Sequence, residues 1–190
     1  FDENYKFVRA IGDPNCIGLT VAYKPKRIAV DSVGRMYVLV NNCYEGFAEL
    51  DPEGNFNRYV GATPVTVSLI DRFWRSIQTE AQQARSSLWL PTTYSDLAID
   101  AEGFLYASIA DSTSKDPIRK LNASGDDVMP ESEFTERPMG DFDESGKSLS
   151  NLTNIAVADD GRFAVLDSVY SRIFVYSNDG NRSEERRVGK

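Results

Sequence analysis

The sequence is informative first for what it lacks: its 190 residues include no histidine and only two cysteines. Without histidine, the chain cannot build the Ser–His or Cys–His pairs that many hydrolases use for nucleophilic catalysis. Cys16 and Cys43 are not in CxxC spacing, and two sulfur ligands alone are too few for a zinc site. We expect two buried free thiols, with a disulfide as the alternative if the protein is exported.

Long apolar runs and clusters of basic residues are missing as well. No stretch approaches the ~18 consecutive apolar residues that a transmembrane helix requires, so we expect no direct membrane insertion by this sequence. The formal net charge is −8, and no stripe of Lys and Arg interrupts the acidic composition. Because nucleic-acid phosphates require clustered cations, we expect no nucleic-acid partner.

What is present is a repeat. The segments 28–38, 97–107 and 155–165 align without gaps, each as an apolar strand, a polar turn closed by glycine, and a second apolar strand. The turn glycines are Gly34, Gly103 and Gly161, and each has a second turn glycine 19 to 22 residues further on. Glycine provides the positive φ that tight hairpin turns need. The repeat therefore predicts units of two successive hairpins.

Four-stranded antiparallel units that recur along a chain are typical of the blades of a β-propeller. We predict an all-β fold over residues 1–181: a partial β-propeller of about three four-stranded antiparallel blades. Residues 1–12 parallel residues 50–61, and we expect them to be the last hairpin of a preceding blade. A β-sandwich with accidental hairpin similarity is the alternative.

The last nine residues, 182–190, break with this rhythm. Their Arg- and Glu-rich order resembles a translated sequencing adapter, so we interpret them as a non-native tail and set them aside. A natural charged tail is the alternative. The segment carries four cations and two anions, and without it the formal net charge becomes −10.

The third unit carries a family resemblance. Its residues 154–157, 160–167 and 171–176 are similar to the NHL-repeat pattern, and residues 25–40 follow the same pattern. NHL repeats build six-bladed propellers related to gluconolactonase, regucalcin and the TolB-like proteins. The resemblance implies that Gly34, Gly103 and Gly161 are structural turn positions, and that Asp167 and Arg172 join the strands of their blade. Related bacterial propellers are often extracytoplasmic or membrane-anchored, and we expect the same here.

Two insertions separate the units, since successive turn glycines are 69 and 58 positions apart, against about 40–50 in ordinary blades. Apolar residues recur at three- and four-residue steps in residues 63–90, which predicts an amphipathic helix. This helix packs on the propeller, forms a lid or partner-docking element through Arg72, Trp74, Arg75 and Trp89, or lies on a membrane surface. Residues 126–150 form an acidic loop, and a calcium loop is the alternative.

Two functions follow as hypotheses. The first is a non-catalytic recognition propeller that binds a protein, a glycan or a small ligand and needs no cofactor. The second is a metal-dependent lactonase, which the gluconolactonase resemblance implies, with a divalent cation such as Ca²⁺ at the axis. Asn154 is a weak candidate ligand for that cation, because it lies one residue out of step with the family position. Alternatively, Asn154 satisfies backbone groups at the start of its strand.

Overall fold

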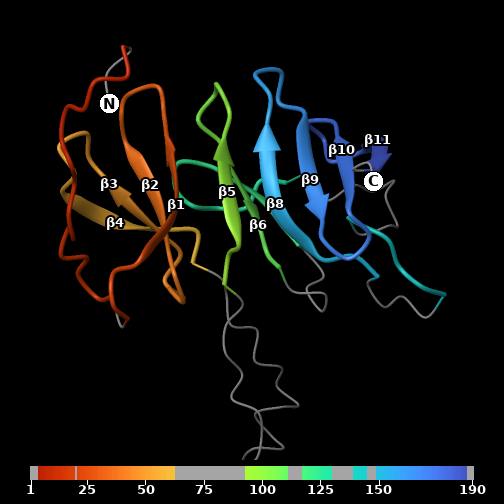
Figure 1. Ribbon diagram of the computed structural model, residues 1–190, viewed down its shortest axis with the longest axis horizontal. Helices are drawn as coiled ribbons and strands as arrows, with labels where there is room; N and C mark the ends of the chain where they lie inside the picture. Colours follow the sequence, from red (N-terminus) through yellow and green to blue (C-terminus); the bar gives the residue numbers. More distant parts are fainter. Residues whose placement is uncertain are drawn as a thin grey trace, which may run out of the picture.

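The computed structural model describes residues 4–19, 21–62, 93–110, 117–129, 139–144 and 149–187. Within these ranges all regular structure is β-strand, in three antiparallel sheets that lie side by side (Figure 1). The first sheet contains β1 (Pro25–Val30), β2 (Met36–Val40), β3 (Phe47–Leu50) and β4 (Phe56–Val60). The second contains β5 (Asp96–Ile99), β6 (Leu105–Ser108) and β7 (Ile118–Leu121), and the third β8 (Leu152–Val157), β9 (Phe163–Asp167), β10 (Arg172–Tyr176) and β11 (Arg182–Arg187).

Every strand pairs with its neighbour in sequence, so each sheet is an up-and-down meander. The first strands of the sheets, β1, β5 and β8, lie next to one another, with β5 between the other two (Figure 1). Meanders whose first strands gather side by side are blades around an axis. The predicted partial β-propeller of about three antiparallel blades is confirmed.

Polar side chains set the hairpin turns. The Asp31 carboxylate accepts hydrogen bonds from the backbone N–H groups of Val33 and Arg35, at 3.0 and 2.9 Å. Asp100 and Asn122 bond the N–H groups two and four residues ahead in the same way. This local bonding favours a turn over a continued strand. The glycine that closes each turn has a positive φ, as at Gly34 (φ 86°).

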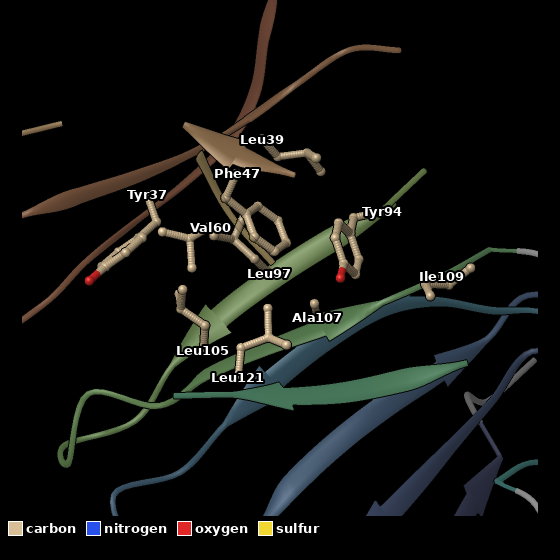
Figure 2. Packing of buried hydrophobic residues seen from close by; sticks show 10 residues of the cluster. All are labelled: Tyr37, Leu39, Phe47, Val60, Tyr94, Leu97, Leu105, Ala107, Ile109 and Leu121. Carbon is tan, nitrogen blue, oxygen red and sulfur yellow. The ribbon is translucent and has the colours of Figure 1, made fainter. Parts of the chain in front are cut away.

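Apolar side chains fill the spaces between blades. Figure 2 shows the cluster between the first two sheets, where Phe47 and Tyr94 stack with their ring centroids 4.5 Å apart. Between the second and third sheets the Tyr106 and Phe163 rings lie 5.3 Å apart. Because side chains alternate along a strand, Leu105 and Ala107 face the first sheet while Tyr106 faces the third. Both faces of β6 are thus buried, as the stacking of blades requires.

Among the described residues, the second sheet has three strands rather than the expected four. After the turn that begins at Asn122, only an isolated bridge joins Leu121 to Asp127. The Asp127 side chain accepts hydrogen bonds from the backbone N–H groups of Lys120 (3.2 Å) and Met129 (3.0 Å). A carboxylate that takes such hydrogen bonds competes with strand pairing, and within residues 122–129 the pairing does not extend beyond that bridge.

Other sequence predictions fare differently. The described residues 4–19 contain no strand, in place of the expected hairpin, and the Arg9 guanidinium reaches the carbonyls of Pro52 and Glu53. Segment 182–187 pairs with β10 as β11, and the interpretation of residues 182–190 as a non-native tail stays a prediction. Cys16 and Cys43 are both free and buried.

The two insertions are mostly outside the described residues. Arg72, Trp74, Arg75 and Trp89, with the expected helix over 63–90, lie in the undescribed segment 63–92 and remain predictions. Of the acidic loop, residues 126–129, 139–144 and 149–150 are described. In the described part of the chain, no helix is long and apolar enough to cross a membrane.

Candidate functional site

A polar cluster joins the three first strands near their starts. Arg27 in β1, Asp96 in β5 and Asn154 in β8 each lie seven residues before the turn glycine of their unit. They therefore occupy one position of the repeat in three successive blades. We call these three residues the axial cluster.

Asp96 is the centre of the axial cluster. It is 7% exposed, and its Oδ1 accepts a hydrogen bond from Arg27 Nε at 2.9 Å. Its Oδ2 accepts from Asn154 Nδ2 at 3.0 Å and from the backbone N–H of Ile155 at 3.2 Å. One carboxylate therefore joins all three blades, and each hydrogen bond to it is charge-assisted.

Irregular pairing helps to aim the two outer members of the axial cluster. β1 and β2 change register between Pro25 and Arg27, and β8 and β9 change register between Leu152 and Asn154. An extra residue in one strand bends it and re-aims the side chains that follow. Both bulges come immediately before the cluster position, and Asp96 is the first residue of β5, which pairs with β6 without interruption.

The axial cluster is open to solvent on the cation's side. The Arg27 side chain is 46% exposed, whereas the Asp96 side chain is 10% exposed. Arg27 Nη1 also donates to the carbonyl of Lys26 at 3.0 Å. The planar guanidinium carries five N–H donors, so an exposed edge suits a ligand with several oxygen acceptors.

A divalent cation fits this set of residues poorly. Within the described ranges, no group of three or more His, Cys, Asp or Glu side chains could hold a metal ion. The single carboxylate of the cluster already neutralises a guanidinium 2.9 Å away. A cation bound to Asp96 would meet the positive charge of Arg27, which opposes binding.

Two other residues expected from the sequence, Asp167 and Arg172, lie within the third blade. Asp167, fully buried at the end of β9, pairs with Arg172 of β10 at 3.1 Å. It also accepts hydrogen bonds from Ser150 Oγ and from the Asn151 backbone N–H, just before β8. These contacts connect the start of β8 to the hairpin of β9 and β10.

Sequence reasoning singled out Asn154 and missed Arg27 and Asp96. The signal that could have found them is the repeat itself, because a polar residue recurs seven positions before each turn glycine, at the edge of an apolar strand. Asn154 by itself is one residue out of step with the ligand position that the resemblance implies. Three polar residues at the same repeat position, by contrast, indicate a shared site.

Two solved structures that resemble this fold are lyases. The chain is similar to a streptogramin B lyase at 16% identity and a TM-score of 0.51, over 87% of this chain and 41% of that one. It is similar to virginiamycin B lyase from Staphylococcus aureus at 11% identity and a TM-score of 0.51, over 87% and 42%. No known family and no curated protein matches the sequence. The chain spans less than half the length of these two proteins.

At such identities the likeness concerns the fold alone. Together with the three stacked meanders, it makes this chain a part of a β-propeller with a charged and polar cluster where the first strands of the blades meet.

Proposed function

We propose that the chain belongs to a non-catalytic recognition propeller of NHL-repeat type, which binds a polar small ligand or a glycan at the axial cluster. The observation that carries the proposal is the shared repeat position of Arg27, Asp96 and Asn154. When successive blades place the same repeat position near one axis, the side chains at that position can form a site while the strands stay the same.

The electrostatics of the cluster favour recognition over hydrolysis. Asp96 holds Arg27 and Asn154 in place, and Arg27 presents the exposed charge. A preorganised guanidinium is suited to hydroxyl and carboxylate oxygens. The ligand we favour therefore carries several such oxygens, as sugars and sugar acids do.

The lactonase alternative rests on one observation, that Asn154 and Asp96 place two oxygen-bearing side chains within 3.0 Å of each other. Both are ligand types that Ca²⁺ accepts. For this alternative Asn154 Oδ1 would face the cation, further ligands would have to join it, and Arg27 would have to leave Asp96.

The test is calorimetry on the full chain with gluconate and, separately, with Ca²⁺, together with an assay for hydrolysis of glucono-1,5-lactone. We expect gluconate to bind, an Arg27→Met variant to bind at least about tenfold more weakly because charge-assisted hydrogen bonds are lost, and the lactone to persist. For Ca²⁺ the test variant is Asn154→Ala. Its matched control is Asn57→Ala, which changes an exposed asparagine of β4.

The opposite pattern would establish the lactonase. Millimolar or tighter Ca²⁺ binding that Asn154→Ala abolishes and Asn57→Ala retains, accompanied by lactone hydrolysis, contradicts a recognition role. If Arg27→Met binds gluconate as tightly as the unaltered chain does, the axial cluster is not the gluconate-binding site.

A further inference from the structure

A buried lysine lies between the second and third blades. Lys120 of β7 is 7% exposed and pairs in register with Tyr106 of β6, on the face that packs against the third sheet. Lysine is rarely buried to this degree without an ionic partner. Its surroundings therefore indicate what the site can bind.

The Lys120 ammonium is held by aromatic rings and one amide. Nζ lies 4.5 Å from the ring centroid of Phe104 and 5.2 Å from that of Tyr106. It donates a hydrogen bond to Asn178 Oδ1 at 2.5 Å, and the Tyr106 hydroxyl donates to the same oxygen at 3.1 Å. Asn178 belongs to the turn after β10, so both blades contribute to the site.

The positive charge of Lys120 is not neutralised by any carboxylate within 4.0 Å among the residues the structure describes. Asp127, seven positions further along the chain, accepts a hydrogen bond from the backbone N–H of Lys120, but its carboxylate pairs with Arg119. An ammonium has three N–H donors, and Asn178 takes one of them. Burial of such a charge is costly, and an anionic ligand would recover part of that cost.

Lys120 lines a surface pocket to which both blades contribute. The lining residues are Phe104, Lys120, Asn122, Val128, Ser177, Asn178 and Asp179. Phe104 and Val128 provide apolar surface beside the charge. Phe104 follows the end of β5, whereas Asp96 begins that strand, so this pocket is separate from the axial cluster.

Asp179 limits the charge of the ligand. Hydrogen bonds from Ser177 and Asn181 lower the pKa of the Asp179 carboxyl below its usual value, so this group is ionised at neutral pH. A carboxylate that lines the pocket repels a ligand with two negative charges more strongly than a ligand with one.

We propose that this pocket is a binding site for a small monocarboxylate with a flat apolar body. The ligand carboxylate pairs with the Lys120 ammonium, and its body lies against Phe104 and Val128. The proposal is independent of the function proposed for the axial cluster, since the two sites share no residue.

Benzoate is the probe, with benzamide as its neutral analogue and inorganic phosphate as a more highly charged anion. We expect the unaltered chain to bind benzoate at least about tenfold more tightly than benzamide, because a hydrogen bond between two charges is stronger than one to a neutral group. Binding is measured by calorimetry, and NMR shifts of the Phe104 and Val128 amides place the ligand.

The variant Lys120→Met has an unbranched side chain one heavy atom shorter, and its thioether can pack on the two rings that the ammonium now covers. We expect it to lose benzoate binding, while Lys24→Met, at an exposed lysine, retains it. Asp179→Asn should tighten benzoate binding a few-fold at low salt.

Three results would overturn the assignment. The first is that benzoate does not bind at millimolar concentrations, and the second is that the unaltered chain binds benzoate and benzamide with equal affinity. The third is that the chain binds phosphate more tightly than benzoate. The first two measurements need no variant, so they decide the question even if Lys120→Met fails to fold.

Discussion

Replacement of Asp96 by alanine tests whether the axial cluster joins the blades. The substitution removes the acceptor for the Asn154 amide and for the backbone N–H of Ile155, which is itself buried. An unpaired buried donor costs about 1–3 kcal/mol, and loss of the half-exposed Arg27 pair adds less than about 1 kcal/mol. We therefore expect a loss of about 1–4 kcal/mol in the free energy of unfolding.

Urea unfolding with an independent measure of the m-value gives that free energy directly. In thermal unfolding, each kcal/mol corresponds to roughly 2–4 °C for a chain of this size. Asp96→Asn retains the shape and one oxygen acceptor, so we expect it to lose about half as much as the alanine variant. Glu102→Ala removes an exposed carboxylate from the turn of the same sheet and provides the control.

The reasoning is refuted if Asp96→Ala and the parent differ by less than about 0.5 kcal/mol, the range of ordinary surface substitutions.

Two further predictions concern the turns and the thiols. Gly161→Ala should destabilise the protein more than Gly103→Ala in urea unfolding: both glycines have positive φ, but only at Gly161 would a Cβ collide with a side chain, at 2.9 Å from Asn178 Cγ. Equal losses would show that the collision is harmless. Burial and a hydrogen bond to a neighbouring glutamate raise the pKa of Cys43 to about 12, and burial raises that of Cys16. Because thiolates are the reactive form, Ellman's reagent at pH 8 should label neither thiol before urea is added and both afterwards, and rapid labelling of the native chain would contradict the burial.

The hairpins could be predicted from the sequence because their determinants are local. A turn such as Asp31–Arg35 needs an Asp side chain that bonds the backbone ahead of it and a glycine with positive φ, and both are visible as residues. The apolar alternation on either side then fixes which face each strand buries.

The three-stranded extent of the second sheet within the described residues could not be predicted, because it depends on a competition between hydrogen bonds. The Asp127 carboxylate accepts a hydrogen bond from the backbone N–H of Lys120. Nothing in the residue pattern predicts whether this side-chain bond or the backbone pairing of a fourth strand forms. β11 shows the converse. Arg182–Arg187 has no apolar alternation, yet it pairs with β10, since an outer strand needs backbone partners more than a buried face.

The axial cluster could be predicted only in part, for a different reason. Asn154 lies one residue out of step with the metal-ligand position that the gluconolactonase resemblance implies. Because strand side chains alternate, that offset predicts a side chain on the opposite face of the strand. The register shift between Leu152 and Asn154 changes that alternation, and a bulge has no clear signature in a single sequence. Neither Arg27 nor Asp96 could be identified as a site residue by itself, because their contact joins residues 69 positions apart.

The shared repeat position gives Arg27 and Asn154 a role that differs from that of Asp96 between them. The Asp96 carboxylate joins the three blades and has to stay, whereas the two outer side chains follow register shifts and can be exchanged without removing that acceptor. A library randomised at the codons of Arg27 and Asn154, with Asp96 retained, would therefore vary the proposed ligand contacts while the strand residues that follow the three positions, Ile28, Leu97 and Ile155, stay constant.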